Sequence, residues 1–201
     1  MKTTKKILSI LVVASVVLGA AGCKKKGKDF SYKSIEKVME EYDIEAYDDV
    51  DEYTGSHPEG TDGQPKYLMC SGDDAQDAYD AVINRLNQFP DYAVKELFHT
   101  MGISGKEAYT IYMITLESEK KAEEMYKKMK KKLKDEKVEE STKEKSGYNY
   151  ILIENKSAIG GLYQSRDKLI YVYGTIDSDG QEIISDVCSK LGIIAPEDAQ
   201  D

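Results

Sequence analysis

Residues 107–134 read EAYTIYMITLESEKKAEEMYKKMKKKLK and contain the clearest pattern in the chain. The first ten, Glu107–Leu116, are mostly β-branched, aromatic or long apolar residues, which favour a strand. Both alternating sets of side chains are largely apolar, so we expect this strand to lie at the centre of a sheet. Ser118 is a typical N-cap for a following helix that runs to about Lys134. The apolar face of that predicted helix comprises Ala122, Met125, Tyr126, Met129 and Leu133.

A strand followed by a helix is also predicted at residues 66–89 and 168–191. Two more strands are predicted at residues 148–154 and 160–164, and Ser165-Arg166-Asp167 forms a tight connection to the last strand. Helices that follow strands, together with a hairpin, indicate an α+β fold. We expect a mainly antiparallel sheet with helices packed on one face, and a ferredoxin-like split β-α-β arrangement in residues 107–191.

Three other segments are predicted from weaker patterns. Residues 30–42 have the apolar spacing of a helix. Residues 91–101 are predicted to form a short helix because Val94, Leu97, Phe98 and Met101 follow the same spacing, which leaves His99 off the stripe as a surface residue. Residues 135–146 are predicted to be a charged connector. The domain is then a single α+β unit over residues 30–195, followed by a polar tail at 196–201.

Tyrosines recur on two of the predicted strands. Tyr148 and Tyr150 alternate with isoleucines on one strand, and Tyr171 and Tyr173 alternate with aliphatic residues on the last strand. A sheet covered on one face leaves the other more open, and tyrosine is favoured at contact surfaces. We therefore predict a binding face made by these four tyrosines. The alternative is that tyrosine simply suits a half-buried strand position.

The acidic segment from Glu40 to Asp80 holds 14 carboxylates and one basic residue, Lys66. A divalent cation could use His57, Glu59 and Asp62, but the spacing of a calcium loop is absent, so solvated acidic loops are favoured and we predict no metal or other cofactor. The chain also lacks the nucleophile, zinc and phosphate-binding motifs of common enzymes, and we predict a non-catalytic protein. Its two histidines lie far apart in the sequence.

The net charge and the cysteine content indicate which partners and disulfides to expect. The formal charge is −9, and the first 22 residues carry three lysines and no acid, so the rest of the chain is still more acidic. A domain with this negative charge is repelled by nucleic acid, and we predict no nucleic-acid partner. Besides Cys23, the chain contains only Cys70 and Cys188, which could pair in an oxidising compartment but which we expect to be unpaired buried thiols.

The N-terminus has the three parts of an export signal. Lys2, Lys5 and Lys6 precede an apolar run, residues 7–18, that is too short to span a membrane. The run ends in Leu18-Gly19-Ala20-Ala21-Gly22-Cys23, which resembles the lipobox of bacterial lipoprotein precursors. The alternative is an ordinary secretory signal that leaves a free thiol at Cys23.

The whole layout resembles small lipoproteins of low-GC Gram-positive bacteria, which have a single α+β domain. This resemblance implies a signal peptide at 1–22, a lipidated Cys23 with a lysine-rich tether at 23–29, and a membrane anchor facing outside the cytoplasm. A domain so placed is expected to bind a protein or a small ligand. The alternative is a small ligand-capturing lipoprotein that serves a transporter, although a single domain is small for that role.

Overall fold

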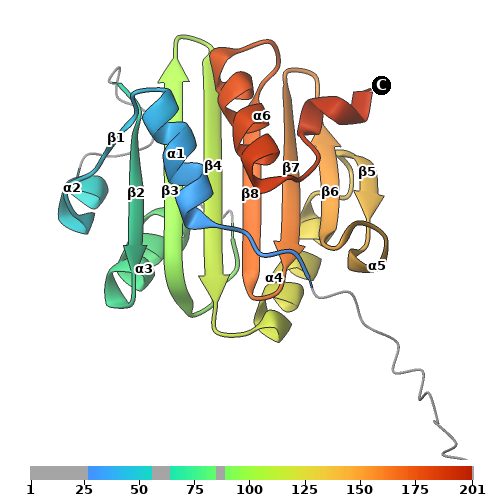
Figure 1. The fold of residues 1–201 in the computed structure, drawn as a ribbon, viewed down its shortest axis with the longest axis horizontal. Coiled ribbons are helices and arrows are strands. Elements are labelled where there is room, and N and C mark those ends of the chain that lie inside the picture. Colours follow the sequence, from blue (N-terminus) through green and yellow to red (C-terminus); the bar gives the residue numbers. More distant parts are fainter. Residues whose placement is uncertain (1–26, 56–63, 85–88, 201) are drawn as a thin grey trace, which may run out of the picture.

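The computed structural model describes residues 27–55, 64–84 and 89–200. They form an eight-stranded sheet in the order β1-β2-β3-β4-β8-β7-β6-β5 (Figure 1). The strands are β1 (Glu45–Ala46), β2 (Lys66–Ser71), β3 (Val94–Ser104), β4 (Glu107–Leu116), β5 (Lys137–Ser141), β6 (Asn149–Glu154), β7 (Ala158–Ser165) and β8 (Lys168–Thr175). The helices are α1 (Tyr32–Glu41), α2 (Val50–Gly55), α3 (Asp73–Ala78), α4 (Glu119–Lys132), α5 (Lys143–Ser146) and α6 (Asp179–Leu191), with a π-helical segment η1 (Tyr79–Asn84) and a 3-10 helix η2 (Pro196–Gln200).

The predicted α+β class is confirmed, and the sheet is mainly antiparallel, with β1 parallel to β2. The prediction of a central strand at Glu107–Leu116 is also confirmed. β4 pairs with β3 on one side and β8 on the other, and its residues from Tyr109 to Leu116 are buried. The Ser118 hydroxyl accepts a hydrogen bond from the backbone N–H of Lys121, which caps α4 as expected.

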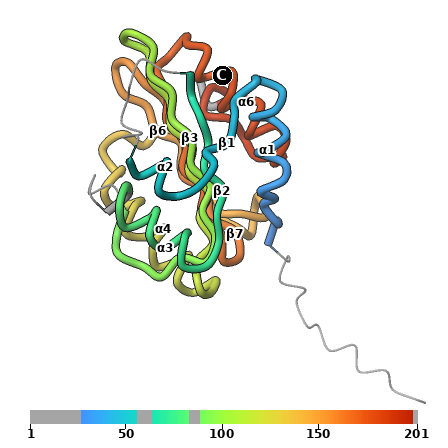
Figure 2. The backbone as a smooth tube through the Cα atoms, turned by 90° about the vertical axis from the view of Figure 1, so that its left-hand side faces the viewer, coloured from blue at the N-terminus to red at the C-terminus, as the bar shows by residue number. Residues whose placement is uncertain are grey.

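Helices cover both faces of the sheet, so the prediction that they pack on one face was wrong. Figure 2 shows the sheet on edge, with α1 and α6 on one side and α2, α3 and α4 on the other. The physical reason is visible in β8, whose successive side chains point to opposite faces. Ile170 and Val172 pack with α1 and α6, whereas Leu169 packs with the core under α4. Because both sets are apolar, both faces need a cover.

The connection between β4 and β5 differs from the ferredoxin-like arrangement predicted for residues 107–191. α4 carries the chain from β4 across the sheet to β5 at its far edge, and three strands lie between these two. The chain then returns through β6, β7 and β8 as antiparallel neighbours, which places β8 beside β4. A split β-α-β unit of the ferredoxin type has one strand in that gap, so this part of the prediction was wrong.

The helix predicted at residues 91–101 is the strand β3. Its apolar residues do follow a helical spacing, but Leu97 lies in the core beneath α4 and Phe98 in the core beneath α1 and α6. β3 pairs with β2 and β4 along its length. A strand buried on both faces has apolar residues at consecutive positions, so the helical spacing of this segment is a coincidence that sheet pairing overrides.

Two segments are more structured than predicted. Residues 135–146 contain β5 and α5 as well as turns, and residues 196–200 form η2 against β6 and β7 instead of a free polar tail. η2 is held by Glu197, which accepts hydrogen bonds from Gln181 and Ser185 of α6. The other predicted strands and the first and last helices are confirmed, with ends that differ by a few residues.

Candidate functional site

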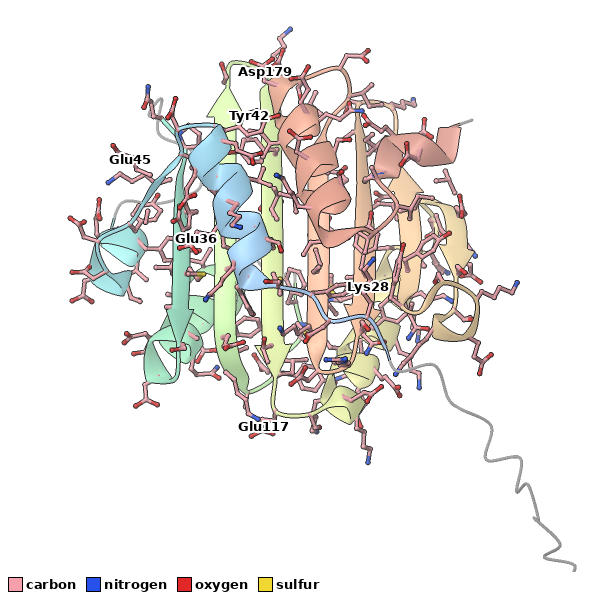
Figure 3. The ribbon with its side chains drawn as sticks, viewed as in Figure 1. Lys28, Glu36, Tyr42, Glu45, Glu117 and Asp179 are labelled. Carbon is pink, nitrogen blue, oxygen red and sulfur yellow. The ribbon has the colours of Figure 1, made fainter. Side chains whose placement is uncertain are left out.

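A cavity of about 1180 Å³ opens where β7 turns into β8 and α4 begins. Its wall is formed by Gly27, Ser118, Glu119, Glu123, Thr142, Lys143, Glu144, Asn149, Arg166 and Asp167, and we call it the base cavity. Glu117, the neighbour of Ser118 in the sequence, lies at the lower end of the domain in Figure 3, and Asp179 lies at the opposite end. Gly27, the first residue that the structure describes, belongs to the wall. The cavity therefore lies where residues 27–29 lead into the domain.

The two cationic side chains of the wall are both engaged in ion pairs. The Nζ of Lys143, on α5, bonds to Oε1 of Glu119 at the start of α4. The Nη1 of Arg166 lies 2.9 Å from Oδ2 of Asp29, and its Nε donates to the carbonyl oxygen of Gly27 at 2.9 Å. Arg166 thereby contacts both the backbone of Gly27 and the side chain of Asp29, in the segment that precedes α1.

A chain of amide groups positions the Arg166 turn. The Oδ1 of Asn149 accepts from the backbone N–H of Lys143 at 2.9 Å, and its Nδ2 donates to Oε1 of Gln164. The Nε2 of Gln164 then donates to the carbonyl oxygen of Arg166 at 2.8 Å. Arg166 has a φ of 53°, a left-handed conformation that side chains other than glycine rarely adopt. These hydrogen bonds stabilise that turn, because Gln164 is fully buried and both ends of its amide are used.

The hydroxyl of Ser165 lies beside this network. The Ser165 hydroxyl is buried, and it makes no hydrogen bond within the part of the chain that the structure describes. It lies against the backbone of Gly27, since a Cβ at that glycine would come within 2.8 Å of the Ser165 Oγ and 2.9 Å of the Lys143 Cε. A buried hydroxyl without a partner costs about 1–3 kcal/mol.

A second polar cluster lies inside the domain, around His99. The prediction of a surface position for His99 was wrong: the side chain is 1% exposed, because β3 is a strand covered on both faces. Its Nδ1 is 2.5 Å from the Tyr53 hydroxyl and its Nε2 is 3.3 Å from the Thr110 hydroxyl. Burial lowers the pKa of His99 to about 3, which keeps the imidazole neutral near pH 7. No carboxylate of the described ranges bonds to it.

The four tyrosines predicted as one binding face lie on opposite faces of the sheet. Tyr148 and Tyr150 belong to the core beneath α1 and α6, whereas Tyr171 and Tyr173 pack against the core beneath α4. The rings form two separate pairs, Tyr148 with Tyr150 and Tyr171 with Tyr173, at centroid distances of 5.6 and 6.2 Å.

Strand register explains this separation. Ile151 is paired through Leu162 with Tyr171, so the isoleucines of β6 share a face with the tyrosines of β8. The sequence gives the alternation within each strand but not the pairing between strands, and a shift of one residue exchanges the faces. Tyr148 and Tyr150 are less than 10% exposed, and Tyr171 and Tyr173 are half-buried. The structure therefore does not bring the predicted face together.

Several predicted site residues lie outside the described ranges. These are Cys23 with the signal and most of the tether, and His57, Glu59 and Asp62 of the acidic loop. Within the described ranges, no three His, Cys, Asp or Glu side chains meet as potential metal ligands, and no helix is long and apolar enough to cross a membrane. Cys70 and Cys188 are unpaired thiols, as predicted, but only Cys188 is buried, and the prediction of a buried Cys70 was wrong because its side chain is partly exposed.

The base cavity was not predicted from the sequence. Its residues come from the start of the domain, α4, α5, β6 and the β7–β8 turn, which the β4–α4–β5 crossover brings together. The local signals available were the tight connection at Ser165-Arg166-Asp167 and the polar side chains of Asn149 and Gln164 at the ends of apolar strands. No protein-family model, curated protein or solved structure matches this chain.

Proposed function

We propose that this chain is a membrane-anchored extracytoplasmic lipoprotein with a non-catalytic binding or interaction domain. The observation that carries the proposal is the run of small residues that ends in Cys23, after a positive segment and a short apolar run. Cys23 is the proposed site of lipid attachment. A single acyl chain holds a protein only weakly, so stable anchoring takes a second chain or an adjacent basic segment.

The contacts that residues 27–30 make with the rest of the domain support this proposal. Residues 27–30 are fastened by Arg166 and by Lys168, whose Nζ donates to the carbonyl oxygen of Phe30 at 2.6 Å. Three residues lie between Cys23 and Gly27, and the four fully extended steps from one Cα to the other reach about 14 Å. A lipid on Cys23 would thus hold the base cavity close to the bilayer, and the adjacent lysines would favour anionic headgroups.

The setting of the described histidine supports a non-catalytic role. A general base needs contact with a substrate and a pKa near the working pH. His99 is enclosed by aromatic side chains, and its pKa is lowered to about 3. Its hydrogen bond to Tyr53 is explained by packing of α2 on the sheet, and its contact with Thr110 by the packing of β3 beside β4.

A ligand-capturing lipoprotein that serves a transporter is the second candidate. The base cavity favours it, because its volume suits a small molecule. The lining is mostly polar and charged, so the ligand would be a polar one. The presence of a single sheet in the described ranges, with no second lobe to close over a ligand, favours the interaction role.

Intact-mass spectrometry and cell fractionation test the anchor. The wild type should be recovered from membranes as a chain that begins at Cys23 and carries the added mass of a diacylated glyceryl group. Cys23→Ala should lose that mass and the membrane association, whereas the control Cys70→Ala should keep both. A soluble wild type without added mass would refute the lipoprotein proposal.

A further inference from the structure

His99 is covered by three structural elements, and α2 is the smallest of them. Its imidazole stacks on Tyr112 of β4, its direct partner on β2 is Leu68, and Tyr53 of α2 contacts its Nδ1. β2 and β4 each pair with two neighbouring strands, whereas α2 has six residues, of which only Tyr53 is buried. α2 lies at the β2 edge of the sheet (Figure 1). It can therefore detach and uncover His99 while the sheet stays paired.

The hydrogen bonds around His99 determine which ring nitrogen carries the proton. The Thr110 hydroxyl donates to the carbonyl oxygen of Thr100 at 3.4 Å, so it accepts from the Nε2–H of His99. The Nδ1 of the neutral ring then has no hydrogen and accepts the O–H of Tyr53. A second proton on the ring would go to Nδ1. It would remove the acceptor of the Tyr53 hydroxyl and create a buried positive charge.

Between pH 5 and pH 7, His99 is the group in this cluster whose charge can change. The other titratable side chains that face it or pack on Tyr53 are phenols and a thiol, which are neutral in this range: Tyr47, Tyr53, Tyr112 and Cys70. Burial, followed by the charge of Asp74 on α3, raises the pKa of Cys70 to about 11. Asp74 itself is exposed. No carboxylate of the described ranges bonds to His99, so an imidazolium at this position would have no counter-ion there.

A salt bridge also attaches α2 to the sheet. Oε1 of Glu52 lies 2.8 Å from Nζ of Lys66 at the start of β2, and both side chains are partly exposed. The hydrogen bond from Lys66 holds the pKa of Glu52 below its usual range, so this carboxylate stays ionised at pH 5. The salt bridge is therefore present at pH 7 and at pH 5, and it cannot cause a change in α2 between them.

We propose that α2 is a pH switch: protonation of His99 breaks its bond with Tyr53 and detaches α2, while the eight-stranded sheet stays folded. Detachment exposes His99 and Tyr112, which are buried when α2 is in place. Histidine is the side chain that senses pH near neutrality in such switches. The inference does not depend on lipid attachment, so failure of the anchor would leave it standing.

The size of the effect follows from the two protonation states. Burial lowers the pKa of His99 to about 3 when α2 is in place, so the closed form binds no proton between pH 7 and pH 5. In the detached form the pKa returns to about 6.5, and this form gains the proton as the pH falls. The equilibrium constant for detachment should therefore rise about 25-fold from pH 7 to pH 5.

Hydrogen exchange followed by mass spectrometry tests the switch. The protein would be residues 23–201 with Cys23→Ser, which keeps every described residue. After correction for the intrinsic exchange rate, the protection of amides in α2 should fall about 25-fold from pH 7 to pH 5. At both pH values it should stay below the protection of amides in β4, because β4 exchanges only when the sheet unfolds. A change in α2 of less than fivefold, or equal protection in α2 and β4, would overturn the proposal.

Two variants distinguish His99 from the salt bridge. His99→Gln has no titrating group at this position, so the protection of α2 should differ less than twofold between the two pH values. Glu52→Gln removes the salt bridge, so it should lower the protection at both pH values and keep the ratio of about 25. Circular dichroism would verify that both variants are folded. A pH dependence that persists in His99→Gln, or that is lost in Glu52→Gln, would refute the assignment of the switch to His99.

Discussion

The imidazole of His99 stacks on the ring of Tyr112, with centroids 4.2 Å apart and planes within 8° of parallel. The two residues are direct partners on β3 and β4, at the centre of the sheet. Tyr53 closes the cluster from α2 through its hydroxyl, which reaches the Nδ1 of His99. A short helix is thus fixed to the sheet by a buried polar contact, and the properties of this contact can be measured.

Acid should destabilise the domain through His99. Burial lowers its folded pKa to about 3, while the unfolded pKa is near 6.5, so below pH 6.5 the unfolded state binds the proton more readily. Stability is therefore full above pH 6.5 and is lost as the pH falls towards 3. Between pH 7 and pH 5, this single group should lower the free energy of unfolding by about 2 kcal/mol. Urea unfolding at both pH values measures the change.

The variant His99→Gln serves as the control for that measurement. It should be less stable at pH 7, but its loss between pH 7 and pH 5 should be about 2 kcal/mol smaller than in the wild type. Equal pH dependence in the two proteins would show that folding does not change the pKa of His99, and would contradict the lowered value.

Tyr53→Phe should destabilise the domain by about 1–3 kcal/mol, because it leaves the Nδ1 of His99 buried without that partner. Tyr47→Phe is the matched control, since Tyr47 packs edge-to-face on Tyr53 and its hydroxyl makes no hydrogen bond within the described chain. Its cost should be below about 0.5 kcal/mol. Thermal and urea unfolding compare the two, and equal losses would contradict the role of the hydroxyl.

Gly160→Ala should destabilise the sheet by about 3 kcal/mol, at the upper end of the range for overpacking. A Cβ at this position would lie 2.5 Å from the carbonyl oxygen of Val172, a backbone atom held in the β7–β8 ladder. Gly55→Ala is the control, because no described atom lies within 4 Å of a Cβ there. Its effect should stay within about 1 kcal/mol, and a similar cost for both changes in urea unfolding would contradict the close approach.

The two thiols should react slowly in the folded protein. Burial raises the pKa of Cys70 to about 11 and that of Cys188 to about 12, so little thiolate is present at pH 8. In a Cys23→Ser variant, which contains only these two cysteines, a chromogenic disulfide reagent should modify both thiols at least about 100-fold faster in guanidinium than in buffer. After denaturation without reductant, the reagent should detect two thiols per chain. A count of zero would reveal a disulfide and contradict the unpaired state.

Much of the fold follows from patterns between neighbouring residues. β4 was recognisable because its β-branched and aromatic residues are consecutive, and α4 because its apolar residues recur at helical spacing after Ser118. These signals are local, since strand and helix periods arise from backbone geometry alone. The same reasoning failed for β3, whose apolar residues fit a helical period but are buried on two faces of the sheet.

Tertiary structure was needed wherever a property depends on the pairing of distant segments. Tyr150 and Tyr171 lie on opposite faces because of the register between β6, β7 and β8, which no single strand encodes. The base cavity brings Gly27 to Arg166, and α4 to α5, through a crossover that passes three strands. The acidity of the chain and the proposed export signal are read from the order and charge of residues, whereas faces, burial and cavities arise only when the sheet has assembled.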